Sequence, residues 1–206
     1  MAKPRFQRRK EDRPAEITQA ALAAFADKGY AATRVDEVAK RAGVSKGLLY
    51  LYFKTKEDLF KAVIRSFLSP QIDALISNIE ETKLSAEEFL RGPFLAFARS
   101  LPKSPAKILI RLMIAEGPKH PDLVAWYWDN VVSRSLAALR TLIKRGVANG
   151  EFRESAVIEF PQLLVTPVFF SVIWMIIFQP HSNLDTDRFI EAHLEIVLDS
   201  IKVRSS

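Results

Sequence analysis

The segment SKGLLYLYFKTK, residues 45–56, carries side chain types that can bind a nucleic acid. A helical wheel centred on Leu49 turns Ser45 and Phe53 inward. The same wheel predicts an outward face and its flanks, formed by Lys46, Gly47, Leu48, Tyr50 and Leu51. Against DNA, such a glycine lets the backbone approach closely and a leucine meets thymine methyl groups. A lysine reaches guanine acceptors, and a tyrosine hydroxyl reaches a phosphate.

Cap and turn residues divide residues 32–60 into three short helices. Thr33, with Asp36 three residues later, predicts an N-cap, so that a helix starts at Arg34. Gly43 is expected to end that helix, because glycine adopts the left-handed conformation at little cost. A turn of only three residues then leads to the next helix, which is the turn length of a helix-turn-helix.

The second and third helices of this window also begin at cap residues. Ser45 is predicted to cap the second helix, and Thr55 with Asp58 the third. Lys54 and Lys56 stand where the third helix starts, and there the exposed N–H groups and the helix dipole favour a phosphate. The window therefore predicts a helix-turn-helix that sits on DNA.

This window resembles the TetR/AcrR family of bacterial transcription regulators over residues 15–60. The matching residues are Thr33, Ala42, Gly43, Val44, Ser45, Tyr50, Phe53, Lys56 and Leu59. The resemblance implies phosphate contacts from Thr33, Tyr50, Tyr52 and Lys56. It implies base contacts from Ser45, Lys46, Gly47 and Leu48. With Arg34 and Lys54, these residues form the predicted DNA-binding surface. Leu48 and Leu51 depart from the family pattern, in which polar residues are usual, so no relative's base preference can be transferred.

The positive charge of the chain is concentrated near this window. Residues 1–60 contain 13 lysines and arginines against 8 acidic residues, whereas residues 61–206 are nearly balanced. Residues 1–13 form a basic arm, which we expect to be disordered in the free protein and able to follow a minor groove. The arm has no apolar stretch and therefore is not a secretory signal peptide.

Helical patterns continue to the C-terminus with almost no strand-like alternation. We therefore predict an all-α protein of about nine helices, with a three-helix DNA-binding domain at residues 14–60. Residues 61–206 are predicted to form a larger helical domain for ligand binding and dimerisation. Within it, Ser85 and Glu88 form a capping box, and Gly117–Pro118 and Asn149–Gly150 mark helix ends.

The segment from Leu163 to Phe178 is uncharged and strongly apolar. Its 16 residues are fewer than the roughly 20 that cross a bilayer, so we expect burial inside protein instead. In the resembled family the last two long helices of each subunit pack into a four-helix dimer bundle. The residues predicted for this homodimer interface are Phe169, Ile173, Phe189, His193, Ile196 and Val197.

Aromatic residues are frequent in the larger domain and favour an apolar or aromatic small molecule if they line a cavity. The alternative for each of them is an ordinary place in the core. The predicted ligand-binding residues are Phe97, Met113, Trp126, Phe170 and Trp174.

An enzyme is not indicated. The chain has no cysteine, and its three histidines lie far apart without metal-ligand spacing, so we expect no metal site, no cofactor and no catalytic residue. We predict a cytoplasmic, homodimeric transcriptional regulator, a repressor that a small apolar or aromatic molecule releases from a palindromic operator. The alternative is a helical protein-interaction or membrane-associated protein without sequence-specific DNA binding.

Overall fold

The computed structural model describes residues 5–203 of the 206-residue chain, and their side chains from Asp12 onward. Over these residues the chain is helical, and its extended pairing is limited to an isolated bridge between Phe152 and Lys202. The predicted all-α fold is confirmed. The described chain divides into two compact units, one made of residues up to 70 with 112–124, the other of residues 71–111 and those from 125 on.

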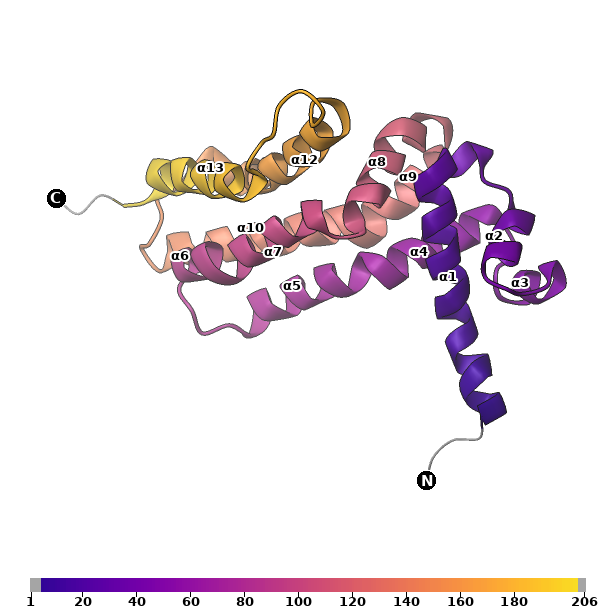
Figure 1. Cartoon of the computed structure of the whole chain (residues 1–206). Helices are drawn as coiled ribbons and strands as arrows, with labels where there is room; N and C mark the ends of the chain where they lie inside the picture. The colour runs from indigo at the N-terminus through magenta and orange to yellow at the C-terminus, as the bar shows by residue number, and fades with distance from the viewer. Residues whose placement is uncertain (1–4, 204–206) are drawn as a thin grey trace. The chain divides into compact units, whose positions relative to one another are not determined.

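The first unit contains the helices of the predicted DNA-binding domain (Figure 1). They are α1 (Arg5–Ala32), α2 (Val35–Arg41), α3 (Lys46–Tyr52) and α4 (Lys56–Phe67). Three segments from the middle of the chain complete it: the end of α8 (Ala106–Glu116), the 3₁₀ turn η3 (Gly117–Lys119) and the beginning of α9 (Pro121–Tyr127).

Helix α1 begins earlier than the sequence indicates. The prediction placed its start at Pro14 and treated the preceding residues as a disordered arm, but the helix runs from Arg5 and contains Pro14. Arginine, lysine and glutamate are good helix formers, so a polar stretch without an apolar face can extend a helix that is anchored further along. The part of the arm at residues 1–4 lies outside the described residues.

An aromatic cluster fills the core of the first unit. The rings of Phe25, Tyr30 and Phe60 lie with centroids 5.1 to 5.6 Å apart, two of the three pairs edge-on. Edge-to-face pairing of this kind adds to the area that the rings bury. Gly29 has a φ of 79°, which bends the end of α1 and places Tyr30 in the cluster.

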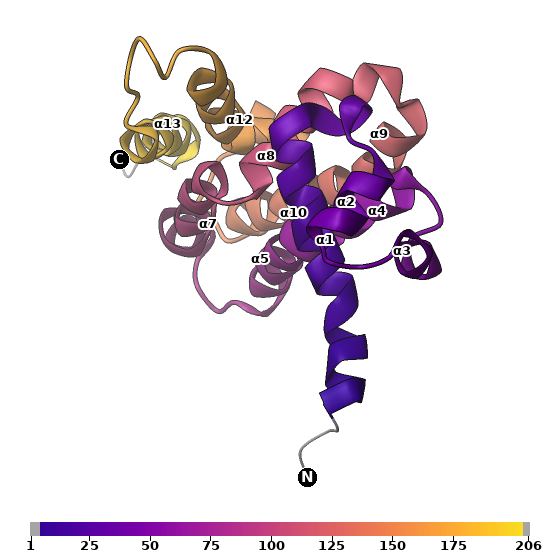
Figure 2. The same cartoon turned by 45° about the vertical axis from the view of Figure 1, so that its right-hand side comes forward.

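The second unit consists of the remaining helices. They are α5 (Ser69–Glu81), α6 (Ala86–Phe89), the π turn η1 (Leu90–Phe94), α7 (Leu95–Ser100), the 3₁₀ turn η2 (Leu101–Lys103), the first part of α8, the π turn η4 (Trp128–Val132), α10 (Ser133–Ala148), α11 (Ala156–Glu159), α12 (Gln162–Ile177) and α13 (Thr186–Ile201). Helices α12 and α13 lie side by side in both views (Figures 1 and 2).

The described chain has more helical segments than the nine or so predicted, because irregular turns divide the longer ones. Gly92 and Pro93 lie in a π turn between α6 and α7. A second π turn, Trp128–Val132, separates α9 from α10. In the first turn Pro93 cannot donate the next helical hydrogen bond, and the wider turn accommodates that loss; the second turn contains no proline.

Close packing and a row of ion pairs hold the second unit together. A Cβ atom on Gly146 of α10 would lie 2.4 Å from the ring of Phe152 and 2.9 Å from Cβ of Ala86, so only glycine fits there. Arg99 of α7 pairs with Glu191 of α13 at 2.9 Å, and Lys103 of η2 pairs with Asp187 of α13. No described helix is long and apolar enough to cross a membrane.

Candidate nucleic-acid interface

A cap at the N-terminus of helix α3 and buried apolar residues along one side fix its position. The Ser45 side chain accepts a hydrogen bond from the backbone N–H of Leu48 at 3.1 Å, as predicted. Gly43 has a φ of 64°, which confirms the left-handed turn before the helix. Leu49 and Phe53 are buried, so the opposite face of the helix points outward.

The outward face of α3 is open. A Cβ atom added to Gly47 would meet no heavy atom within 4 Å, and Leu51 is 73% exposed. Lys46 is exposed as well, whereas Leu48 and Tyr50 are half-buried. Ser45 is exposed, although the wheel turned it inward, because a cap residue lies outside the helical geometry.

An ion pair between α2 and α3 fixes the direction of Lys46. Its Nζ lies 2.8 Å from Oδ1 of Asp36 and 6.0 Å from the centre of the Tyr50 ring. The hydrogen bond raises the pKa of Lys46 and lowers the pKa of Asp36. Both groups are exposed and therefore exchange partners easily, so a base or phosphate oxygen can replace the carboxylate.

The structure corrects the role predicted for Thr33. Helix α2 begins after Arg34, which makes no side-chain cap, and Thr33 is 2% exposed. Its hydroxyl donates to the carbonyl oxygens of Gly29 at 2.6 Å and Ala24 at 3.2 Å. The threonine therefore closes the end of α1, and its predicted phosphate contact stays a prediction. The predicted capping partner, Asp36, pairs with Lys46 instead.

Lys56 is also turned inward. Its Nζ donates to the carbonyl oxygens of Tyr30, Ala31 and Thr33 at 2.9, 3.0 and 3.2 Å, and it lies 4.6 Å from the centre of the Tyr30 ring. An ammonium group has three donors, so these bonds occupy all of them. Burial lowers the pKa of Lys56. The lysine therefore caps the end of α1, and the phosphate contact that the resemblance implied for Lys56 stays a prediction.

Helix α4 starts with the predicted capping box. The Thr55 side chain accepts from the N–H of Asp58, and the Asp58 carboxylate accepts from the N–H of Thr55. Lys54, just before the cap, is exposed, as is Arg34 before α2. Tyr52 is half-buried, and its ring lies 6.3 Å from that of Phe53. Phosphate contacts from Arg34, Tyr52 and Lys54 remain predictions.

A segment distant in sequence joins the helix-turn-helix, which the sequence did not indicate. The ring of His120 packs edge-on against Tyr30, with centroids 4.8 Å apart. The carboxylate of Glu116 approaches Gly29, and its charge opposes the lowering of the pKa of Lys56 by burial. Both residues belong to the first unit, so helix α8 contributes to both units of the chain.

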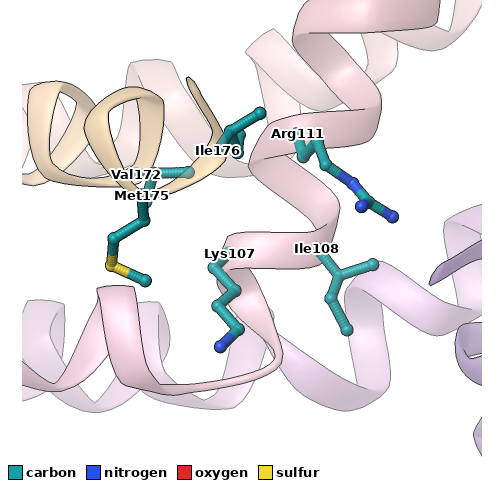
Figure 3. Close-up of a pocket in the computed structure, with 6 residues that line it drawn as sticks. All are labelled: Lys107, Ile108, Arg111, Val172, Met175 and Ile176. Carbon is teal, nitrogen blue, oxygen red and sulfur yellow. The ribbon is translucent and has the colours of Figure 1, made fainter. Parts of the chain in front are cut away.

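Two cavities lie among the described residues of the second unit. One, of about 340 Å³, is almost entirely apolar and is lined by Val132, Leu136, Gln162, Val165, Thr166, Phe169, Phe170 and Ile173. The other, of about 300 Å³, lies between α8 and α12 and is lined by Lys107, Ile108, Arg111, Val172, Met175 and Ile176 (Figure 3).

Only one of the predicted ligand-binding residues lines either of these cavities. Phe170 lines the apolar one, whereas Phe97, Met113, Trp126 and Trp174 line neither. Trp174 contacts Phe170 and Phe178 in a row of aromatic rings along α12. Met113 belongs to the first unit. The sequence shows that aromatic residues are frequent, but not which of them pack in the core and which line a pocket.

The residues predicted for the dimer interface fall into two groups. Phe169, Ile173 and Ile196 are exposed, at 41%, 37% and 69%. The others are engaged within the chain: Phe189 against the Phe170 ring, His193 with the carbonyl oxygen of Leu163 at 2.7 Å, and Val197 in the core at 9% exposure.

Two family models together match most of the chain. The model "Bacterial regulatory proteins, tetR family" matches residues 17–63, and "AefR-like transcriptional repressor, C-terminal domain" matches residues 88–200. The chain belongs to the TetR family. This TetR-family chain is 30% identical to the HTH-type transcriptional repressor KstR2 of Mycolicibacterium smegmatis, over 90% of this chain and 89% of that protein.

Solved structures of TetR-family proteins share the fold. A TetR-family transcriptional regulator from Mesorhizobium loti aligns with a TM-score of 0.71 at 24% identity, over 98% of this chain and 100% of that one. FadR of Bacillus subtilis, solved in complex with stearoyl-CoA, aligns with a TM-score of 0.74 at 24% identity, over 91% and 98%. The TetR-family chain is thus a ligand-responsive DNA-binding transcriptional repressor and not an enzyme.

Proposed function

We propose that α3 reads operator DNA in the major groove. The observation that carries this proposal is the open outward face of the helix, where Gly47 has empty space around it and Leu51 is 73% exposed. An exposed leucine one helical turn from an open glycine offers a base edge both an apolar contact for a thymine methyl and a close approach to the backbone. Lys46, Lys54 and Arg34 surround this face with positive charge.

Within this surface the side chains have different roles. Lys46 leaves Asp36 to reach a base edge, and Tyr50 donates its hydroxyl to a phosphate. Thr33 and Lys56 act as positioning residues, because their polar atoms hold the end of α1 against α4. The basic residues before Pro14 follow the adjacent groove or backbone.

Two substitutions separate these roles. Tyr50→Ala should weaken binding to all sequences about equally, whereas Lys46→Ala should also relax the preference at one symmetric pair of positions. The readout is affinity for a panel of operator variants at fixed salt, with Lys144→Ala on α10 as a matched exposed control. If both α3 variants bind every sequence as tightly as the control, α3 is not the reading helix.

We also infer that the chain works as a homodimer through α12 and α13. Exposed apolar side chains follow these helices, namely Leu163, Phe169, Phe170, Ile173, Ile176, Ile177, Phe178 and Ile196. Soluble monomers rarely expose so continuous an apolar face, and a second copy would bury it. A dimer also presents two α3 helices to two half-sites of a palindromic operator.

The effector is proposed to be a small, largely apolar molecule that binds the second unit and releases the operator. Two observations support this: both cavities have apolar walls, and the structurally similar FadR was solved with stearoyl-CoA. Helix α8 lines one cavity with Lys107 and Arg111, and its last residues belong to the first unit. A shift of α8 would therefore change both the cavity and the packing of the first unit. We expect this action in the cytoplasm.

A thermal-shift and operator-binding screen tests the effector proposal. An effector that binds the DNA-free form preferentially should weaken operator binding, and operator should weaken effector binding by the same factor. Apolar compounds that stabilise the protein without changing operator affinity would be ligands but not effectors. If no bound compound changes operator affinity in either direction, the chain is not ligand-responsive in the way proposed.

A further inference from the structure

We propose that Asp36 is a specificity-determining residue, because its carboxylate holds Lys46 and repels DNA phosphates until a matching base edge takes its place. This inference rests on the proposed function, since it requires that α3 lies against DNA. It names the residue that makes the reading surface discriminate between operator and other DNA, which the contacts of α3 alone do not.

Both carboxylate oxygens of Asp36 contact the ammonium group of Lys46. The Lys46 Nζ lies 2.8 Å from Oδ1 and 3.1 Å from Oδ2. Helices α2 and α3 are neighbours (Figures 1 and 2), so this ion pair joins the first helix of the helix-turn-helix to the reading helix. The side chains of Asp36 and Lys46 are 49% and 59% exposed. The pair therefore lies at the surface, where a groove of DNA can reach it.

The ion pair neutralises the charge of the reading helix. Lys46 is the only charged residue of α3, whose sequence is KGLLYLY. The hydrogen bond from Lys46 is the main cause of the lowered pKa of Asp36, and the positive charge of Arg34 adds to it, so the carboxylate is ionised at neutral pH. Each cation that neutralises a phosphate adds affinity for DNA of any sequence. A carboxylate that occupies the cation opposes that gain.

The edge of a base pair can replace this ion pair better than a phosphate can. In the major groove, guanine offers its O6 and N7 acceptors to a lysine, and cytosine offers an amino donor to a carboxylate. Bases can therefore satisfy Lys46 and Asp36 together. A phosphate also accepts from Lys46, but its negative charge repels Asp36. The repulsion weakens contacts with the backbone more than contacts with the matching bases, which is how it creates specificity.

The stability of the helix-turn-helix does not by itself require an acidic residue at this position. Asp36 stands in the first turn of α2, where the helix dipole favours a negative charge, but Glu37 supplies a charge at the same end. Glu37 pairs with Lys28, and the exposed Asp27 of α1 pairs with Arg41 at 2.7 Å. Of these three acidic residues, Asp36 is the one that pairs with α3.

The test measures the affinity of the parent chain and of Asp36→Asn for two duplexes at several salt concentrations. One duplex is a genomic fragment that the parent chain enriches, and the other has the same bases in scrambled order. Asp36→Asn should bind the scrambled duplex about tenfold more tightly and change the affinity for the genomic fragment by less than about threefold, so the ratio of the two affinities falls. On scrambled DNA, the slope of log affinity against log salt should steepen by about 0.9, because Lys46 gains one phosphate.

Three further variants assign the effect. Asp36→Glu keeps a carboxylate within reach of Lys46 and should keep most of the parent's affinity ratio. Asp27→Asn removes the same charge from the exposed pair with Arg41 and should leave both the ratio and the slope unchanged. In a Lys46→Ala background, Asp36→Asn should no longer steepen the slope, since the gained phosphate contact belongs to Lys46. Thermal unfolding of each variant checks that the fold is kept.

An unchanged affinity ratio in Asp36→Asn, or an equal fall in Asp27→Asn, would overturn this inference while leaving operator recognition by α3 intact. A less stable Asp36→Asn with the parent's ratio would also overturn it, because Asp36 would then only support α2. Failure of the proposed function has a different signature. The parent chain would enrich no fragment, or Lys46→Ala and Tyr50→Ala would bind every sequence like Lys144→Ala, and this inference would fail with it.

Discussion

At the residue scale, the polar groups near the helix-turn-helix divide into those that hold helices together and those that face outward. Thr33 and Lys56 have the side chain types of phosphate ligands, yet their donors are used by the carbonyl oxygens of α1. Leu51 has the opposite character, because it is apolar and exposed. Because of their exposure, we propose Lys46, Gly47 and Leu51 as the centre of the surface that reads DNA.

Leu51 is expected to read thymine methyl groups. Replacing a contacted thymine by uracil removes one methyl and should weaken binding by about 0.8 kcal/mol, the value for one buried carbon group. Leu51→Ala should weaken binding to the thymine operator by a similar amount and should no longer respond to the replacement. The measurement is a double-mutant cycle of operator affinity. Strict additivity of the two changes would show that Leu51 does not touch the methyl groups.

Lys56 is expected to support the fold rather than the DNA contact. Lys56→Met keeps the aliphatic stem but removes three hydrogen bonds to carbonyl oxygens, so the free energy of unfolding should fall by about 1 kcal/mol. This value is already reduced for the partial exposure of Lys56, since solvent screens its charge. Lys54→Met, at an exposed position, should change stability by less than about 0.5 kcal/mol. Urea unfolding of both variants measures the difference. Equal stability of the two variants would show that Lys56 does not support the fold and would favour a phosphate contact instead.

At the element scale, local capping was predictable and long-range packing was not. The caps at Ser45 and Thr55, and the capping box of Ser85 with Glu88, are confirmed because each is a contact within four residues. The predicted cap at Thr33 was wrong because carbonyl groups earlier in the chain, at Gly29 and Ala24, compete for its hydroxyl. Likewise, the pairing of His120 with Tyr30 depends on chain segments that only the fold brings together.

Gly146 shows most clearly what the sequence could not reveal. Gly146→Ala would place a methyl group 2.4 Å from the Phe152 ring, and overpacking of this kind costs about 1–3 kcal/mol. Alanine's better helix propensity, about 1 kcal/mol, offsets only part of this cost. Gly92→Ala is the matched control, since a Cβ atom there meets nothing within 4 Å. If thermal unfolding shows Gly146→Ala to be as stable as Gly92→Ala, the crossing of α6 and α10 is not as close as described.

At the scale of the whole molecule, we propose that two copies of the chain read DNA together. The exposed apolar side chains of α12 and α13 offer a surface for the dimer interface. A dimer is required because one short reading helix per copy contacts only a few bases. The sequence predicted both helices, but it could not tell outward from inward positions where a helix is apolar all round. Val197 is therefore a core residue, whereas Ile196 beside it is 69% exposed.

Ile196→Asp is expected to break the dimer, because an unpaired charge would be buried in the interface at a cost of roughly 3–5 kcal/mol. The monomer should keep its fold, since the side chain is exposed within one copy. Leu84→Asp introduces the same charge at another exposed aliphatic residue and should leave the dimer intact. Sedimentation velocity at micromolar concentration measures both. An unchanged dimer for Ile196→Asp would exclude α13 from the interface.

The most direct test of the central claim is to sequence the genomic DNA fragments that the purified protein binds. A dimer that reads DNA with two α3 helices should enrich one inverted repeat, with half-site centres separated by about one helical turn, 34–36 Å, or a multiple of it. Lys46→Ala should change the base preference within each half-site and leave the spacing unchanged. Enrichment of no sequence, or of a single half-site without two-fold symmetry, would contradict the account.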